Sequence, residues 1–442
     1  MSEGVLVPQH LKNNLHDLHI LPDVVPLYDF TYNDFAKDVL IQLLSEPLAS
    51  LDEILNRQHI LKGLIANLGV LKNYSYARID LVEVFHFLGV SPVEKISTNG
   101  LKSLQLQLLF SEKKRHQLRG KCVQMVLLLH RLQVRYFNRI DISQFPEDYK
   151  DELRSIHDFL AGFQLSEWEG LIREQRFTVK HINTLMDVIT EKAAKGEIMQ
   201  FWKRCFLFEA YLSISLGIEQ NGFTFPVFAD GSLLFKELYH PLLKQPVKND
   251  FVTTHNVVLL TGPNMSGKST FLKAVALCVY LAHTGLAIPA SHAAMPFFDS
   301  ISVSIDLNDN IRSGYSHFMS EIMNVKRVVL KAVNNKRCFA VFDELFRGTN
   351  IEDATEISSA TLKGLTRFTG SFFFISTHLH QLKELEEVKR GMISTYYTDC
   401  TIQNDLPLFN YRLKEGWSEL RVGSMLFKKE GLQELLGDCQ ET

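Results

Sequence analysis

Cysteines, long apolar runs and net charge are all scarce in this 442-residue sequence. The 6 cysteines are scattered, without a Cys-x-x-Cys pair or a zinc-ligand spacing, so we expect buried, reduced thiols in a cytoplasmic protein. The longest apolar run, residues 274–282, is too short to cross a bilayer, and the N-terminus lacks the pattern of a secretory signal. We therefore expect no membrane contact.

A net charge of −3 provides no global basic field, so contact with a nucleic acid would require a local patch. Glycine is also scarce before residue 221, where leucine and charged residues dominate. Apolar residues recur there at helical spacing, for example in residues 39–55, 101–110, 123–135 and 180–192. These patterns predict an all-helical domain over residues 1–220.

The composition changes near residue 221. From there, short apolar runs such as 233–238, 338–342 and 371–376 alternate with helical stretches. Buried parallel strands have this continuous apolar character, and their alternation with helices is typical of βαβ units. The sequence therefore predicts an α/β domain with a central, mostly parallel sheet over residues 221–442.

One motif in this second half has a defined chemistry. It comprises Gly262, Pro263, Asn264, Met265, Ser266, Gly267, Lys268, Ser269 and Thr270, and fits the pattern of glycine, four residues, then Gly-Lys-Ser/Thr. An apolar run (257–260) precedes it and a helix-compatible run (271–281) follows it, which is the strand–loop–helix order that the motif requires. We interpret it as a phosphate-binding loop rather than a glycine turn that matches by chance.

Each residue type in this loop has a physical reason. Free N–H groups at a helix N-terminus attract phosphate. Gly262 and Gly267 let the backbone curve around the phosphates without a Cβ clash. Lys268 is expected to reach the β- and γ-phosphates, and the Ser269 hydroxyl to bind Mg²⁺. The predicted ligands are therefore ATP and Mg²⁺.

Two carboxylates, Asp343 and Glu344, follow the apolar run 338–342. At a strand end Asp343 can hold Mg²⁺, directly or through water, because a hard cation prefers oxygen ligands. Glu344 is placed to polarise the attacking water. Most Asp-Glu pairs are merely solvated, but one at a strand end downstream of a phosphate-binding loop favours the catalytic interpretation.

His378 follows the apolar run 371–376, at the strand end where open α/β sheets place ligand contacts. It can bind the γ-phosphate or the attacking water, and with Lys268 and Glu344 it forms the predicted catalytic set. A capping histidine in a loop is the alternative.

The combination of an Asp-Glu pair with a strand-end histidine resembles ATP-binding-cassette (ABC) ATPases, which complete each site with a segment from a second subunit. Ser316 is the candidate for that contact in trans, and an ordinary helix N-cap is the alternative.

Together these motifs resemble the MutS mismatch-repair family. The Gly-Pro-Asn-Met opening at residue 262 is distinctive of that family's ATPase motif, and residues 343–349, 376–378 and 316–321 are similar to three further family motifs. The resemblance implies an ABC-type P-loop ATPase domain with a short C-terminal dimerisation segment. It also implies a preceding helical core or lever domain, an ATP-dependent homodimer, and DNA as a partner.

The resemblance also assigns Phe251 to stacking on adenine, with a core phenylalanine at a strand edge as the alternative. Relatives that read mismatches carry an N-terminal domain with a Phe-x-Glu wedge. Only about 40 residues precede the segment that resembles the helical core, too few for such a domain. We therefore expect ATP hydrolysis without mismatch recognition.

Five basic residues form the best local candidate for contact with DNA: Lys113, Lys114, Arg115, Arg119 and Lys121. Such a cluster can bind phosphates without reading the base sequence. No aromatic residues are interleaved with these charges, so a solvated helix face is the competing interpretation.

Two functions remain open from the sequence. One is a MutS-like DNA-binding ATPase related to DNA mismatch repair, in which ATP-driven dimer closure is coupled to DNA. The other is a mechanochemical ABC-type ATPase that uses the same engine on a protein partner. A transporter ATPase subunit is disfavoured because the Leu-Ser-Gly-Gly-Gln motif is absent from the sequence.

Overall fold

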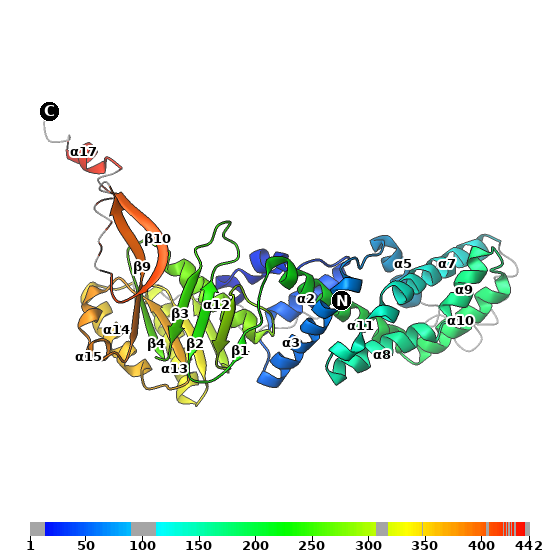
Figure 1. Ribbon diagram of the computed structural model, residues 1–442, viewed down its shortest axis with the longest axis horizontal. Helices are drawn as coiled ribbons and strands as arrows, with labels where there is room; N and C mark the ends of the chain where they lie inside the picture. The colour runs from blue at the N-terminus through cyan, green and yellow to red at the C-terminus, as the bar shows by residue number, and fades with distance from the viewer. Residues whose placement is uncertain are drawn as a thin grey trace. The chain divides into compact units, whose positions relative to one another are not determined.

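The computed structural model describes residues 14–89, 112–305, 317–346, 348–403 and 406–418, together with residues 420, 422, 425, 427 and 430–437. The helix expected at 101–110 and the predicted trans residue Ser316 lie outside the described residues. The chain is of mixed α/β type and forms two compact units (Figure 1). We call Leu27–Leu43 and Asn56–Gln220 the helical unit, and Met1–Pro26, Leu44–Leu55 and Asn221–Thr442 the sheet unit.

All regular structure in the described part of the helical unit is helical. The helices that contribute to it are α2 (Asp34–Ser45), α3 (Leu51–Ala66), α4 (Leu68–Leu71), α5 (Arg78–Gly89), α7 (Glu112–Arg135), η4 (Phe137–Arg139), η5 (Ile142–Gln144), α8 (Glu147–Ala161), α9 (Leu165–Arg173), α10 (Val179–Ala194) and α11 (Glu197–Asn221). The helical spacing predicted over 123–135 and 180–192 is confirmed by α7 and α10, and that over 39–55 belongs to two helices, α2 and α3, which residues 46–50 separate. Within the described residues, no helix combines the length and the apolar character that crossing a membrane requires.

A buried carboxylate ties the start of the helical unit to its longest helix, α11. Glu209 is 3% exposed. Its carboxylate accepts hydrogen bonds from the Tyr32 N–H (2.7 Å), Asn33 Nδ2 (3.1 Å) and the Tyr76 hydroxyl (2.5 Å). Burial raises the pKa of Glu209, and these donors oppose that shift because they stabilise the ionised form.

The sheet unit contains two sheets. A six-stranded sheet has the order β10-β9-β4-β8-β7-β6, and a four-stranded sheet has the order β1-β5-β2-β3. The strands are β1 (Val227–Phe228), β2 (Leu233–Leu238), β3 (Asn249–Thr253), β4 (Val257–Thr261), β5 (His292–Met295), β6 (Ser300–Ser304), β7 (Cys338–Phe342), β8 (Phe372–Ser376), β9 (Ser394–Gln403) and β10 (Leu406–Glu415). In the larger sheet β9, β4, β8, β7 and β6 pair in parallel, and β10 is antiparallel to β9.

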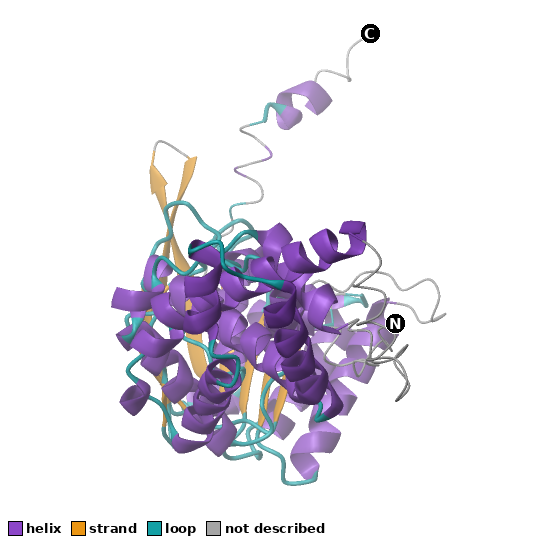
Figure 2. Ribbon diagram, turned by 90° about the vertical axis from the view of Figure 1, so that its right-hand side faces the viewer, coloured by secondary structure: helices purple, strands orange, loops and turns teal. Residues whose placement is uncertain are grey.

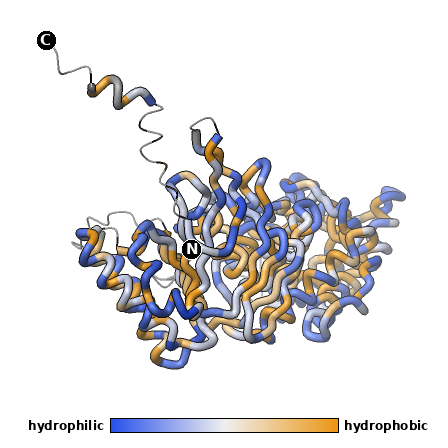
Figure 3. Tube along the Cα trace, turned by 60° about the vertical axis from the view of Figure 1, so that its left-hand side comes forward, coloured by the Kyte–Doolittle hydropathy of each residue, from blue (hydrophilic) through white to orange (hydrophobic). Residues whose placement is uncertain are grey.

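Both faces of the central strands are buried, which explains their continuous apolar sequences. One face packs against α13 (His317–Val333) and α14 (Ile351–Leu365), through a core that includes Phe373 of β8. Phe374 points to the opposite face, where Phe251 of β3 packs against both Phe374 and Phe271 of α12 (Lys268–His283). Apolar colour accordingly runs along the central strands in Figure 3.

The chain then continues through three short helices and a long hairpin. The helices are η7 (His380–Glu384), α15 (Glu386–Lys389) and α17 (Leu432–Gly437). Between α15 and α17, β9 and β10 form the hairpin, whose outer end extends beyond the helices in Figure 2. No local pattern in the sequence predicted this hairpin, although β9 lies directly beside β4 in the sheet.

Asparagine side chains form hydrogen bonds with backbone groups at both outer edges of the six-stranded sheet. At the β6 edge, Asn14 Nδ2 donates to the Ile301 carbonyl (3.0 Å) and Asn14 Oδ1 accepts from the Val303 N–H (2.9 Å). At the β10 edge, Asn249 Nδ2 donates to the Tyr411 carbonyl (3.1 Å) and its Oδ1 accepts from the Leu413 N–H (2.8 Å). Each amide replaces a missing neighbouring strand, which protects the edge from pairing with another chain.

We expect Asn14→Ala to lower the free energy of unfolding of the sheet unit by about 2 kcal/mol, because it removes two hydrogen bonds and leaves buried backbone groups without partners. Urea denaturation measures this loss, and hydrogen exchange of β6 locates it. The control is Asn334→Ala, which alters an exposed asparagine of the same unit. Equal stability of the two variants, with unchanged exchange in β6, would contradict the edge-capping role.

Candidate functional site

The parallel sheet brings the predicted site residues to one edge. β4 leads into the loop 262–267 and then α12, β7 leads into Asp343 and Glu344, and β8 leads into His378. In the sheet β8 lies between β4 and β7. Because parallel strands present their carboxyl ends at the same edge, residues up to 116 positions apart, His378 and Gly262, are collected there.

The loop between β4 and α12 depends on its two glycines. Gly262 has φ 131° and Gly267 has φ 97°, backbone conformations that residues with a Cβ rarely adopt. A Cβ at Gly262 would lie 2.9 Å from Thr398 Oγ1 and 3.1 Å from Ser266 Oγ. Ser266 is fully buried, and its hydroxyl donates to the Pro263 carbonyl at 2.7 Å and contacts Thr398 Oγ1. The loop is therefore closed on itself and attached to β9.

Lys268, the first residue of α12, lies over the loop and is only 5% exposed. Its Nζ donates to the carbonyls of Gly262 (2.8 Å) and Pro263 (3.0 Å). Burial lowers the pKa of the Lys268 ammonium, while the nearby carboxylates of Glu344 and Asp343 oppose this shift. The lysine and both carboxylates thus interact electrostatically, which agrees with the prediction that all three residues belong to one site.

The last residue of β8, Ser376, bonds to both Asp343 and Glu344. The Ser376 hydroxyl donates to Asp343 Oδ1 and accepts a hydrogen bond from the Glu344 N–H at 2.7 Å. Glu344 has a left-handed backbone (φ 52°), and its Oε1 lies 2.7 Å from His378 Nε2. The predicted water-polarising glutamate and the predicted strand-end histidine are therefore direct partners.

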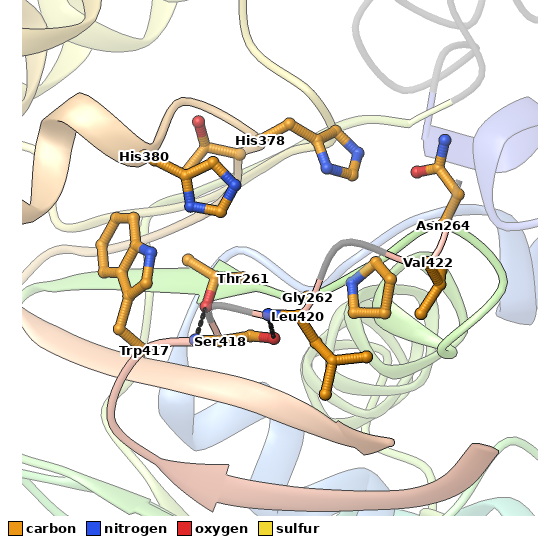
Figure 4. Close-up of a pocket in the computed structure, with 11 residues that line it drawn as sticks. Thr261, Gly262, Asn264, His378, His380, Trp417, Ser418, Leu420 and Val422 are labelled. Carbon is orange, nitrogen blue, oxygen red and sulfur yellow. Dashed lines mark hydrogen bonds between the residues drawn. The ribbon is translucent and has the colours of Figure 1, made fainter. Parts of the chain in front are cut away.

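Two cavities adjoin the loop. The larger, of about 650 Å³, is lined by Lys268, Ser269, Thr270 and Glu344, and on other sides by residues that include His240 and Tyr411. The smaller, of about 220 Å³, is lined by Gly262 and Pro263 of the loop and by His378. Figure 4 shows His378 and His380 on one wall of the smaller cavity and Gly262 with Ser418 on the opposite wall. Both cavities are thus lined in part by residues of the loop, and both include Asn264.

Phe251, which the family resemblance assigned to stacking on adenine, is instead buried in the core. It is 2% exposed, and its ring is surrounded by Phe271, Phe374 and Tyr396, with centroids 5.0–5.7 Å away. It also does not line the larger cavity, whereas Tyr411 does. The geometry favours the core-phenylalanine alternative, because Phe251 lies on the buried face of β3, where neighbouring rings leave no room for a base to stack on it.

The basic cluster predicted for DNA contact lies in the first turns of α7. Lys113, Lys114, Arg119 and Lys121 are exposed, and Arg115 is half-buried. Lys121 Nζ also lies 6.0 Å from the centre of the Phe87 ring. The cluster is in the helical unit, so it is not part of the site described above.

Several residues of the site were missed from the sequence: Ser376, Thr398, Tyr411 and Ser418. Ser376 begins a recognised motif, but nothing local shows that its hydroxyl bonds to the Asp343 carboxylate and to the Glu344 N–H at the end of another strand. Thr398, which contacts Ser266 of the loop, and Tyr411, which lines the larger cavity, belong to the hairpin, more than 100 residues after the loop. Their contribution depends on the pairing of β9 with β4, which no local sequence signal specifies.

The comparisons with known proteins agree on one family. Residues 258–434 match MutS domain V. The chain is similar to the DNA mismatch repair protein MutS of Bacillus velezensis, at 29% identity over 271 residues, and of Listeria welshimeri, at 33% identity over 214 residues. It is also similar to the protein of that name from Lactococcus lactis subsp. lactis, at 30% identity over 316 residues. The chain belongs to the MutS family.

The similarity to these MutS proteins is partial in both directions. The matched stretches cover 59%, 46% and 68% of this chain, respectively, and 31%, 24% and 37% of the three relatives. This chain thus spans about a quarter to a third of the length of the curated MutS proteins that it matches. The match to MutS domain V begins within β4 and includes the loop, both carboxylates and His378.

We expect Gly262→Ala to lower the free energy of unfolding of the sheet unit by about 1–3 kcal/mol, because a Cβ is strained at φ 131° and crowds Thr398. Thermal denaturation measures this effect. The control, Gly364→Ala in α14, meets no atom within 4 Å and should be neutral or stabilising by up to about 1 kcal/mol. A Gly262→Ala variant as stable as this control would show that the loop conformation is not constrained.

Proposed function

We propose that this chain is a MutS-like ATPase that binds ATP and Mg²⁺ at the loop between β4 and α12, closes as a dimer on the nucleotide and couples closure to DNA. The observation that carries the proposal is the arrangement of Lys268, the Asp343–Glu344 pair and His378 at the ends of three adjacent parallel strands. In this proposal the arrangement serves as an ABC-type P-loop site, and the helical unit serves as the core or lever domain.

The loop and α12 supply the groups that a triphosphate needs. The first N–H groups of α12 have no acceptor within the helix and carry the positive end of its dipole. Lys268 would exchange its bonds to the two loop carbonyls for bonds to phosphate oxygens, whose charge also offsets the cost of its burial. Lys268, His240 and Tyr411 all line the larger cavity, which gives the nucleoside a place beside the loop.

The donor set fits Mg²⁺ bound through phosphates. Ser269 offers an exposed hydroxyl and Asp343 offers a carboxylate, both hard oxygen ligands. Within the described residues, no group of three or more His, Cys, Asp or Glu side chains could hold a metal by itself. Mg²⁺ commonly relies on one or two protein oxygens together with substrate phosphates and water. When bound there, it would neutralise charge on the phosphates.

Hydrolysis would use the pair of Glu344 and His378. The Glu344 carboxylate orients a water and draws its proton, and His378 Nε2, 2.7 Å from Glu344 Oε1, fixes the direction of that carboxylate. Both residues face solvent in part, with side-chain exposures of 25% and 39%. A second subunit would then exclude bulk water from the site and bring Ser316 toward the γ-phosphate, as the family resemblance implies.

DNA is the partner that the family relationship supports, since the relatives are named as DNA mismatch repair proteins. On this chain the exposed basic cluster on α7 is the surface with matching charge. A protein partner in place of DNA remains the alternative outcome of the test below.

We expect Glu344→Gln to bind ATP but to hydrolyse it at least about 100-fold more slowly, and to accumulate as an ATP-bound dimer, because a neutral amide cannot draw a proton from water. We expect Lys268→Ala to lose ATP binding instead. Binding of a fluorescent ATP analogue, phosphate release and size-exclusion chromatography with light scattering separate these two effects.

The matched controls are Glu356→Gln and Lys244→Ala, which change exposed residues of the same unit. Both controls should behave as the wild-type protein. Rapid hydrolysis by Glu344→Gln would mean that another residue positions the water. Unchanged ATP affinity of Lys268→Ala would refute the assignment of the phosphate-binding loop.

For DNA, we expect binding that weakens steeply with salt and a loss on replacing Lys113 and Arg119 with glutamine. Each lost phosphate contact should lower the slope of log affinity against log salt by about 0.9. Titrations of homoduplex, mismatched and branched DNA at two salt concentrations measure the affinity. The control replaces Arg173 and Lys203, exposed basic residues elsewhere in the helical unit. No binding of any of these DNAs at low salt would favour the protein-partner alternative.

A further inference from the structure

One hydroxyl joins the two carboxylate residues of the site. Ser376, the last residue of β8, is 0% exposed. Its Oγ donates its proton to Asp343 Oδ1 and at the same time accepts the Glu344 N–H at 2.7 Å. The donor and one acceptor position of this hydroxyl are therefore both used by adjacent residues of a different strand end.

The backbone at these carboxylates requires such support. β7 ends at Phe342, and Glu344 and Phe346 have left-handed backbones with φ 52° and 63°. Non-glycine residues in this region are strained, and they persist where the surroundings hold them. The Asp343 N–H bonds to the Ser304 carbonyl at 3.1 Å, whereas the next N–H, that of Glu344, bonds to Ser376.

Ser376 also connects the carboxylates to the phosphate-binding loop. On its other side it pairs with Leu260 of β4, and the Thr377 N–H donates to the Leu260 carbonyl at 3.1 Å. Leu260 is followed by Thr261 and then Gly262, the first residue of the loop. A rigid strand end thus sets the position of Asp343 and Glu344 relative to the loop.

We propose that Ser376 is a positioning residue for ATP hydrolysis. Its hydroxyl holds Oδ1 of Asp343, which leaves Oδ2 to bind Mg²⁺. The same hydroxyl fixes the backbone of Glu344, so that the Glu344 carboxylate contacts His378. The inference rests on the proposed function. It assigns to Ser376 a role in hydrolysis and Mg²⁺ use, not in nucleotide affinity, because its hydroxyl contacts Asp343 and Glu344 and it does not line either cavity beside the loop.

The chain offers a matched control at the opposite end of the same strand. Ser371 directly precedes β8, is 2% exposed, and its Oγ accepts the Cys338 N–H at 3.0 Å. Ser371 and Ser376 are therefore both buried serines that accept a backbone N–H from an end of β7. Ser371→Ala should cost comparable stability without touching the site, which separates positioning from folding.

The experiment compares the wild-type chain with Ser376→Ala, Ser376→Thr and Ser371→Ala. For Ser376→Ala we expect a 10- to 100-fold lower kcat and a higher Mg²⁺ concentration for half-maximal activity, on the order of 10-fold, because residues that orient catalytic or metal-binding groups commonly act on this scale. The dissociation constant of the fluorescent ATP analogue should stay within about 3-fold of wild type, since the loop is intact. Ser376→Thr retains the hydroxyl and should recover most of kcat.

Wild-type kcat and Mg²⁺ dependence in Ser376→Ala would overturn the inference while leaving the proposed function intact. An equal loss of kcat in Ser371→Ala would also overturn it, because the effect would then be structural. If Ser376→Ala does not fold, Ser376→Thr provides the test. A low kcat in this variant, at normal nucleotide affinity and stability, would overturn the inference, because the hydroxyl is still present. Absence of ATP binding and turnover in the wild-type chain would overturn the proposed function and this inference together.

Discussion

The parallel pairing of β4, β8 and β7 is the constraint on which the rest of the site depends. Each strand carries one part of the chemistry at its carboxyl end: the loop with Lys268, the histidine, and the two carboxylates. Helices pack on both faces of these strands and exclude water, so the backbone N–H and C=O groups of the strands must form hydrogen bonds with neighbouring strands. A slip of the register by one residue would exchange the buried faces and dismantle the site at the same time.

Small polar side chains complete what the strands leave unpaired. Asn14 and Asn249 satisfy the outer edges of the sheet, and Ser371 and Ser376 satisfy the two ends of β7. A buried N–H without a partner costs more than an ordinary hydrogen bond contributes, so each of these side chains replaces a missing backbone neighbour. Asn14 also makes the first described residues of the chain a structural part of the sheet unit.

Charge at the site is balanced only in part. Lys268 is buried over the loop, where desolvation works against its charge, and the carboxylates of Glu344 and Asp343 compensate for some of that cost. The two loop carbonyls that it contacts are neutral. An incoming polyanion would supply further negative charge, so a buried lysine whose hydrogen bonds go to neutral carbonyls suits a site that binds phosphate.

The sequence by itself determined the motifs, the central strands and the helical character of the first half. These depend on local patterns: apolar runs in β4, β7 and β8, helical spacing in α7 and α10, and glycines where the loop must turn. The proximity of Lys268 to the carboxylates also followed from the sequence, because parallel strands place the residues at their carboxyl ends along one edge of the sheet. The family resemblance could place Phe251 in the site, but not decide its exposure.

Only the tertiary structure decided which side chains surround the motifs. Phe251 lies in the core because α12, β8 and β9 pack around it, while Tyr411, on a hairpin that the sequence did not reveal, lines the cavity. Ser376 acquired its two partners because β8 lies between β4 and β7. Such contacts join residues far apart in the chain, and strand order, which local patterns do not encode, determines them.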